Sequence, residues 1–226
     1  MEDAVDVWRA PLRLRAAEVE RLWALLSDDE AARVARFRFP EHRAAWVVAR
    51  ATLRRVLGAY VRRPPASLRF GAGSHGKPLL AGGPHFNLSH SGNVALIAVG
   101  GARRVGVDVE QVREIEHDRL AGRFFSPAEN EQLAALSQAE RHGAFFACWT
   151  RKEAVVKAQG VGLSLDLDAF DVSVTGPARL LATRPDSAEA HRWSLADVDA
   201  GPGYAAAVAA EGDGWHVVVR DVEGAA

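Results

Sequence analysis

Cysteine is almost absent from this chain of 226 residues, in which Cys148 is the single example. One cysteine excludes a disulfide within the chain and suits a reducing compartment, so we expect a cytoplasmic protein. Cys148 stands among Phe145, Phe146 and Trp149. That apolar neighbourhood predicts a small buried side chain rather than a nucleophile.

Long apolar runs and an excess of charge of one sign are also missing. No stretch approaches the roughly 18 continuous apolar residues of a membrane span, and the first residues lack the apolar core of a signal peptide. The formal net charge is −1, whereas a general nucleic-acid binder is usually strongly basic. We therefore expect neither a membrane nor a nucleic acid as partner.

The motifs of several common enzyme classes are absent. The sequence contains no H-E-x-x-H, no paired C-x-x-C and no G-x-S-x-G. These absences leave no support for a zinc protease, a zinc ribbon or an α/β-hydrolase. The glycine pattern of a P-loop is missing as well.

Lysine is scarce. Among the 28 lysines and arginines only Lys77, Lys152 and Lys157 are lysines. An arginine stays protonated in proteins, whereas a lysine ammonium is a compact charge whose pKa can shift. Chance is one explanation for the position of three lysines, and a site that binds phosphate or donates a proton is the other.

What the sequence does contain is a set of clear helix signals. Apolar residues at helical spacing predict helices over residues 16–27, 42–61 and 139–160. Ser126 and Glu129 have the spacing of a capping box, which predicts a further helix start. Gly160 is a typical helix C-cap, so we expect the last of these helices to end there.

Strand signals alternate with these helices. Residues 4–9, 94–100 and 104–110 are predicted strands, and several short strand signals follow residue 163. The Gly- and Pro-rich residues 71–84 predict a loop.

The chain therefore runs from helices to strands twice. This order predicts an α+β fold built of two similar halves. We place the halves at residues 1–102 and 103–226.

Two carboxylates in VGVDVE are the first candidate for chemistry. Asp108 and Glu110 are two residues apart, so in a strand they point to the same face. Like charges so close repel unless a cation lies between them, and Mg²⁺ prefers such oxygen ligands. A solvated strand end is the other interpretation of this short motif.

The long helix carries a second group. Trp149, Glu153 and Lys157 are spaced by four and share one face. A surface ion pair would explain the Glu–Lys spacing, but the same face also carries Phe146. A carboxylate beside an ammonium on a partly apolar face suits an acid/base pair. If this helix packs on the Asp108 strand, Glu153 becomes a third carboxylate of the site.

The segment HFNLSHSG offers Asn87, Ser89, His90 and Ser91 in a turn-rich stretch, with Lys77 just upstream. Hydroxyl, imidazole and ammonium groups together with free amides suit the binding of phosphate oxygens. A structural turn with a capping serine is the alternative.

Five motifs occur in one order along the chain, namely GKP (76–78), FNLSHSG (86–92), VGVDVE (105–110), RFFSPAE (123–129) and WTRKEAVVKAQGVGLSL (149–165). Together they resemble the 4′-phosphopantetheinyl transferases of the surfactin-synthetase-activating type, and the resemblance covers residues 30–175. It implies a pseudo-dimer of two α+β halves with the active site in the cleft between them.

The resemblance also implies a reaction. Coenzyme A would bind as co-substrate with Mg²⁺ on its pyrophosphate, and a serine hydroxyl of an apo acyl or peptidyl carrier protein would attack the β-phosphorus. The phosphopantetheine arm would move to that serine, and adenosine 3′,5′-bisphosphate would leave.

The roles of individual residues follow from the matching motif positions. The metal ligands would be Asp108, Glu110 and Glu153, and Glu153 would also be the base on the attacking serine. Lys157 would stabilise or protonate the leaving phosphate, and His90 would lie near the 3′-phosphate. The implied contacts to coenzyme A are Lys77, Ser89, His90, Arg33, Arg36 and Lys157.

One position departs from the pattern of the family. The family has basic residues in the N-terminal helices, and Arg33 and Arg36 match the first cluster. The next basic position falls on Ala45. Arg43 or Arg50 would compensate, or the contact is missing.

The carrier protein needs a docking surface. Residues 113–125 are a candidate, because Arg113, Arg119 and Arg123 alternate with apolar side chains and carriers of this class present an acidic, partly apolar helix. A helix that packs on its own core is the alternative. A pseudo-dimer also implies that the protein works as a monomer.

Two other functions compete with the transferase. One is a catalytically silent module that binds coenzyme A or a carrier domain, against which the presence of Glu153 and Lys157 argues. The other is a different Mg²⁺-dependent enzyme acting on nucleotides, such as a phosphohydrolase.

Overall fold

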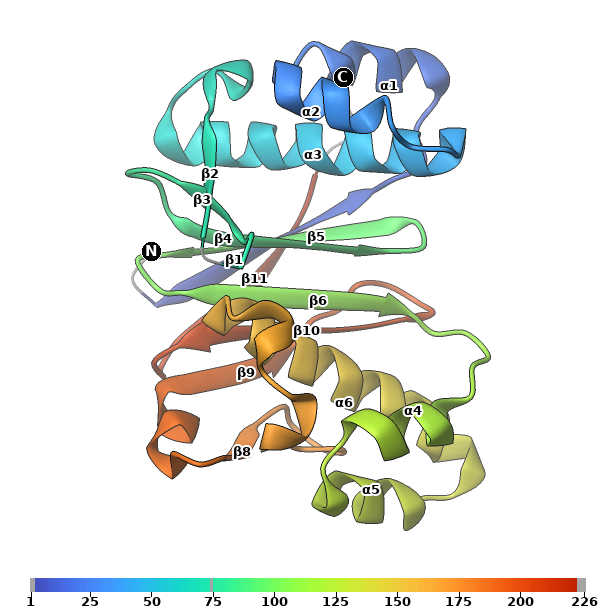
Figure 1. Ribbon diagram of the computed structural model, residues 1–226. Helices are drawn as coiled ribbons and strands as arrows, with labels where there is room; N and C mark the ends of the chain where they lie inside the picture. The colour runs from blue at the N-terminus through green and yellow to red at the C-terminus, as the bar shows by residue number, and fades with distance from the viewer. Residues whose placement is uncertain (1–2, 74, 223–226) are drawn as a thin grey trace.

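The computed structural model describes residues 3–73 and 75–222. Its layers follow one another as helices, sheet, sheet and helices, so that the two sheets face each other in the centre (Figure 1). The predicted α+β fold of two similar halves is thus confirmed. Each half carries one long helix of 22 residues on the outer face of its sheet.

The first half contains a sheet covered by α-helices and a small separate hairpin. Its elements are β1 (Ala4–Pro11), α1 (Ala16–Trp23), α2 (Asp28–Val34), α3 (Pro40–Val61), β2 (Phe70–Ala72), β3 (Pro78–Leu80), β4 (His85–Ser91) and β5 (Val94–Gly101). A short 3-10 turn, Pro65–Ser67, follows α3.

The second half begins with a strand and continues through three α-helices. Its elements are β6 (Val105–Gln111), α4 (His117–Phe124), α5 (Pro127–Ala134), α6 (Gln138–Gln159), β7 (Phe170–Val172), β8 (Leu180–Thr183), β9 (Trp193–Asp197), β10 (Tyr204–Glu211) and β11 (His216–Asp221). Short 3-10 turns lie at Gly162–Ser164, Leu167–Ala169 and Ser187–Arg192.

The C-terminal strand returns to the first half. The first sheet has the order β11-β1-β5-β4, and the second has the order β6-β10-β9. β11 pairs in parallel with β1, whereas the other ladders of these sheets are antiparallel. The division of the chain at residue 102 stays a prediction, and this return means that the second half supplies one strand, β11, to the sheet of the first half.

Strand sequences are apolar throughout because both faces of the central strands are buried. On β5, Leu96 and Ala98 point into the core between the sheets, whereas Ile97 and Val99 pack beneath α3. Strand β10 divides its residues in the same way: Val208 faces the other sheet and Ala207 faces the core under α6. This burial explains why VALIAVG reads as a continuous apolar run.

Two predicted segments were wrong. Residues 71–84 were expected to be loop, but part of this segment belongs to the strands β2 and β3, which pair as a small hairpin. The stretch HFNLSHSG was expected to be turn-rich, and it is the strand β4. Its hydrogen bonds to β5 outweigh the turn preference of its Asn and Ser residues. The predicted first helix also ends early, at Trp23.

Buried charges connect α6 to α5 and to Phe170 at the start of β7. Glu129 starts α5 through the predicted capping box with Ser126. Both its carboxylate oxygens also accept hydrogen bonds from Lys152 Nζ at 2.6 Å, and Lys152 donates to the Phe170 carbonyl at 2.7 Å. Glu129 and Lys152 are fully buried. Lys152 therefore has a structural contact, and Cys148 is buried nearby as predicted, with burial raising its pKa.

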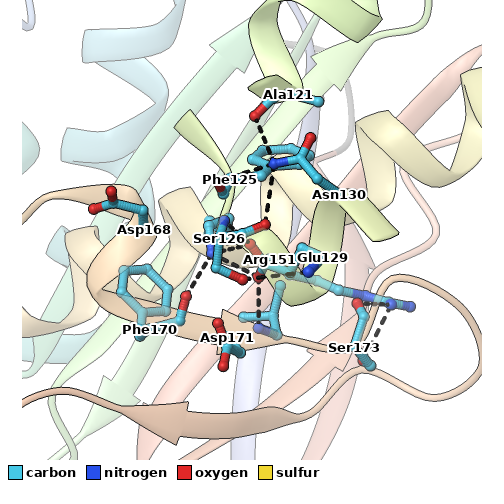
Figure 2. Close-up of polar contacts among 12 residues, drawn as sticks. Ala121, Phe125, Ser126, Glu129, Asn130, Arg151, Asp168, Phe170, Asp171 and Ser173 are labelled. Atoms are coloured by element: carbon cyan, nitrogen blue, oxygen red, sulfur yellow. Dashed lines mark hydrogen bonds and ion pairs between the residues drawn. The ribbon is translucent and has the colours of Figure 1, made fainter. Parts of the chain in front are cut away.

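Further contacts close this network (Figure 2). Asn130 donates to the carbonyls of Ala121, Phe125 and Ser126, and Arg151 donates to the carbonyl of Ser173. These contacts connect α6 to α5 and to the segment Phe170–Ser173.

Gly106 sets the distance between α6 and β6. A Cβ at this residue would lie deep inside van der Waals contact with backbone atoms of Ala154 and Ala158, and 2.7 Å from the carbonyl carbon of Lys157. A side chain at this position would therefore push the helix away from the strand.

We predict that Gly106→Ala lowers the free energy of unfolding by about 3 kcal/mol or more, because backbone atoms cannot move aside as a flexible side chain can. The control is Gly143→Ala on α6, where a new Cβ would have no described atom within 4 Å apart from its chain neighbours and the backbone of its own helix. Alanine should stabilise that helical position by about 1 kcal/mol. Urea denaturation measures both, and a Gly106→Ala variant as stable as the unchanged protein would contradict the prediction.

Candidate active site

Strand β6 presents two carboxylates towards α6. Val105, Val107 and Val109 point into the core between the sheets. The alternate residues Asp108 and Glu110 therefore share the face of Gly106, as the sequence predicts. Asp108 is only 3% exposed.

Side chains of β4 join the two sheets at this point. Asn87 accepts a hydrogen bond from the backbone N–H of Val107 at 2.9 Å. Ser89 donates to Asp108 Oδ1 and Ser91 donates to Glu110 Oε2, both at 2.8 Å. These side chains alternate along β4, so all three face β6. The seam, as we call this set of contacts, fixes the carboxylates in place.

Helix α6 adds an ammonium and a third carboxylate. Lys157 Nζ donates to Asp108 Oδ1 at 2.5 Å and to Ser89 Oγ at 3.0 Å. Glu153 lies one turn earlier on the same face and is half-buried. The expected packing of this helix on the Asp108 strand is therefore present.

The electrostatics of the three carboxylates are unfavourable as they stand. Burial raises the pKa of Asp108, against the opposing effect of Lys157. Burial followed by the charge of Asp108 raises the pKa of Glu153. The pKa of Glu110 is raised chiefly by burial as well. Groups whose pKa values are perturbed by burial and by each other are typical of functional sites.

One oxygen of this group, Oδ2 of Asp108, is buried. Among the described residues, none forms a hydrogen bond with Asp108 Oδ2, although that atom is buried. A buried carboxylate oxygen without a partner is unfavourable unless a ligand binds it. No group of three or more Asp, Glu, His or Cys side chains in residues 3–73 and 75–222 is arranged as a ready metal site.

A cavity of about 540 Å³ opens beside these residues. Glu153 and Lys157 line one part of it, and Trp149 and Phe124 make another part apolar. The rings of Phe124 and Trp149 meet edge to face, with centroids 5.6 Å apart. Charged groups and apolar rings thus share one cavity, which suits a ligand with a polar and an apolar part.

A smaller cavity of about 250 Å³ is lined by His90, the histidine expected near the 3′-phosphate. His90 lines it together with Arg33 from α2, and Arg33 stacks on Trp46 at 5.7 Å. Partial burial and the charge of Lys157 lower the pKa of His90. Asn87 and Pro78 line both cavities, so the two are neighbours. Arg36 lies exposed on the turn after α2.

The two arginines considered as alternatives at the position of Ala45 line different cavities. Arg50 lines the same cavity as His90, and its guanidinium pairs with Glu30 and stacks on Phe70. Arg43 donates to the carbonyl of Phe37 and lines a different cavity. Arg50 is therefore the better placed of the two.

Lys77 lines the large cavity, but its ammonium is bonded to backbone carbonyls. Its Nζ donates to the carbonyl of Val105 at 2.7 Å and to that of Lys157 at 2.6 Å. Burial and the charge of Arg104 lower the pKa of Lys77 to about 8. The phosphate contact expected of Lys77 stays a prediction, as do the roles of the other site residues.

Sequence reasoning missed the function of several residues. Asn87 and Ser91 were noted but were not recognised as links to β6, although their spacing of two around Ser89 was visible once the segment is read as a strand. The acidic residue Glu30, which pairs with Arg50 and Arg54, left no signal beyond its place in a capping box with Ser27.

The chain is similar to known proteins over most of its length. A family model described as 4′-phosphopantetheinyl transferase, N-terminal, matches residues 13–101, and one described as the 4′-phosphopantetheinyl transferase superfamily matches residues 104–209. The transferase HetI of Nostoc sp. is 40% identical over 223 residues, which are 95% of this chain and 91% of HetI. The transferase Sfp of Bacillus subtilis is 31% identical over 199 residues, which are 87% of each chain. The chain belongs to the 4′-phosphopantetheinyl transferase superfamily and is a transferase.

Proposed function

We propose that this protein transfers the 4′-phosphopantetheine arm of coenzyme A to a serine hydroxyl of an apo acyl or peptidyl carrier protein. Adenosine 3′,5′-bisphosphate is the leaving group. The observation that carries the proposal is the cavity lined by Glu153 and Lys157 of α6, next to which the Lys157 ammonium binds the buried carboxylate of Asp108. Phosphoryl transfer depends mainly on positioning and on charge neutralisation, and this arrangement supplies both.

Glu153 is the proposed base. It takes the proton of the carrier serine as the serine oxygen bonds to the β-phosphorus. Burial and the charge of Asp108 raise the pKa of the Glu153 carboxyl, and a carboxylate that lines the cavity is in a position to accept a proton there. Lys157 faces the same cavity and neutralises or protonates the phosphate that leaves.

Mg²⁺ is the proposed metal, and Asp108, Glu110 and Glu153 would hold it. The donor set fits a hard cation, because the carboxylates are crowded and Asp108 Oδ2 is buried without a partner among the described residues. Bound Mg²⁺ neutralises the charge of a pyrophosphate. The Asp108 carboxylate accepts hydrogen bonds from Ser89 and Lys157, and the Glu110 carboxylate accepts one from Ser91.

The phosphates of coenzyme A are proposed to lie along the two neighbouring cavities. Arg33 and His90 line the smaller one, where we place the 3′-phosphate, and Arg50 supplies the positive charge that Ala45 lacks. Ser89 and Lys157 stand at the boundary towards the carboxylates. Arg36 would contribute from the exposed turn. Both halves of one chain supply this site, so we propose a monomer.

The carrier is proposed to dock on residues 113–125. Arg113, Arg119 and Arg123 are exposed there, which suits an acidic partner helix. Ile115, Leu120 and Phe124 pack partly against the core of the second half. The apolar side chains of the segment thus pack on the core of the second half, while its arginines are exposed to solvent.

No helix in residues 3–73 and 75–222 has both the length and the apolar character needed to cross a membrane.

The first test is transfer itself. Intact mass spectrometry of an apo carrier incubated with the protein, coenzyme A and Mg²⁺ should show a gain of one phosphopantetheine. Glu153→Gln should reduce the rate by about 10²–10⁴-fold, because it removes the base and a metal ligand. The exposed Glu131→Gln on α5 is the matched control and should leave the rate unchanged.

Other outcomes identify the competing functions. Binding of coenzyme A without transfer to any of several carriers would indicate the silent module. Release of nucleotide from coenzyme A in the absence of carrier would indicate a phosphohydrolase.

The raised carboxyl pKa values predict how stability depends on pH and Mg²⁺. The folded protein binds more protons at these groups than the unfolded chain does, so its stability falls as pH rises from about 4 towards neutral. A cation that binds the ionised carboxylates should reverse this loss, by about 2.7 kcal/mol at a hundredfold excess over its Kd.

Thermal unfolding at pH 5 and pH 8, with and without MgCl₂, measures this effect. The increase in Tm with Mg²⁺ should be larger at pH 8 and should largely vanish in Asp108→Asn, but not in Glu131→Gln. An equal increase in Asp108→Asn and in the unchanged protein would show that Mg²⁺ binds elsewhere.

Reversal of charge on the docking segment tests the carrier surface. Arg119→Glu with Arg123→Glu should lower kcat/KM for the carrier by about tenfold or more, because repulsion replaces attraction. The KM for coenzyme A should not change. Arg63→Glu with Arg69→Glu makes the same charge change in the first half and serves as control. Unchanged kcat/KM in the first pair would remove these arginines from the interface.

A further inference from the structure

The ammonium of Lys77 joins the two halves of the molecule. The side chain comes from the hairpin of β2 and β3 in the first half. Its Nζ lies 2.7 Å from the carbonyl oxygen of Val105, 2.6 Å from that of Lys157 and 3.4 Å from that of Ala158. An ammonium has three N–H donors, and three carbonyls surround this one. Two of these contacts are short and the third is long, so the ammonium is directed mainly at backbone carbonyls.

Two of these acceptors belong to the end of α6. The last four carbonyls of a helix lack partners within the helix, and a cation close to them is favourable. Gly160 ends α6 in the left-handed conformation, with φ of 73°, and donates to the carbonyl of Val156. The carbonyls of Lys157 and Ala158 in the same turn are bound by Lys77.

The hairpin lies directly against this turn. A Cβ added at Gly160 would be 3.4 Å from Cδ of Lys77, and a Cβ added at Gly162 would be 3.4 Å from Cβ of His75. The contact thus extends beyond a single hydrogen bond, and it covers the turn that follows the two catalytic residues of α6.

The carbonyls that Lys77 binds belong to the two elements, β6 and α6, that carry the Lys157–Asp108 contact. Val105 precedes Asp108 by three residues on β6, and the Lys157 carbonyl belongs to the residue whose ammonium binds Asp108. One half-buried cation therefore sets the backbone of the strand and that of the helix relative to each other. Without it, the end of α6 would keep unsatisfied carbonyls next to the cavity.

We propose that Lys77 is a positioning residue for the transfer reaction: it binds the last turn of α6 to β6, and so keeps the Lys157 ammonium beside Asp108 and the leaving phosphate. This role rests on the proposed function. It differs from direct binding of a coenzyme A phosphate, because the effect of Lys77 passes through the backbone of Lys157.

Lys77→Met keeps the length of the side chain and removes the donors. Its kcat should fall by about 10–100-fold, the size of effect that a small misplacement of catalytic groups produces. The KM for coenzyme A should change by less than about threefold. In the free enzyme, hydrogen exchange at the amides of residues 157–162 should become faster. Lys77→Arg should recover part of both losses, since a guanidinium also donates to carbonyls.

The control is Leu79→Met on the same hairpin, which is 42% exposed and should change neither measurement. A rise in KM for coenzyme A with unchanged kcat and unchanged exchange would indicate a phosphate contact and overturn the proposal. Faster exchange with unchanged kcat would reduce Lys77 to a structural role and overturn it as well.

A further variant covers the case in which Lys77→Met does not fold. Lys77→Gln carries an uncharged amide that still donates to carbonyls, so its kcat should lie between those of the unchanged protein and an enzyme without the contact. The same rise in KM at constant kcat would overturn the proposal. Absence of transfer by the unchanged protein would refute the proposed function itself, and is thereby distinguished from a failure of Lys77 alone.

Discussion

The close approach of α6 to β6 is the constraint on which the site depends. Gly106 permits it, because the backbone of α6 occupies the space in which any other residue would place its Cβ. At this distance Lys157 reaches Asp108, and Glu153 stands over the same strand. A helix held further away would leave the carboxylates of β6 without the ammonium that compensates their charge.

Buried charges occur in two kinds of setting in this protein. Around Glu129 and Lys152 every charged group is paired and bonded to carbonyls or amides, so the network is closed and serves the position of α6. Around Asp108 the network is open: within the described residues one carboxylate oxygen has no partner, and the pKa values of the carboxyl groups are raised. The open network adjoins a cavity, which is why we place the chemistry there.

The surroundings of the three lysines explain why lysine rather than arginine stands at these positions. Each of the three lysines directs an ammonium at several oxygens that converge on one point: two carboxylate oxygens and a carbonyl for Lys152, three carbonyls for Lys77, and a carboxylate and a hydroxyl for Lys157. A compact ammonium with three rotatable donors fits such a point, whereas the planar guanidinium of arginine donates in a fixed fork.

The sequence by itself determined the α+β class, the long helices, the buried strands and the shared face of Asp108 and Glu110, because periodicity and capping act over a few residues. Five ordered motifs also indicated the candidate site residues. The prediction failed for β4, whose Asn and Ser residues favour turns locally but pair with β5. Only the tertiary structure decided that Asn87 and Ser91 link the sheets, that Arg50 rather than Arg43 lines the cavity of His90, and that Lys77 binds the end of α6. Those contacts join residues far apart in the chain, and no local pattern encodes which distant oxygen a side chain meets once the core has formed.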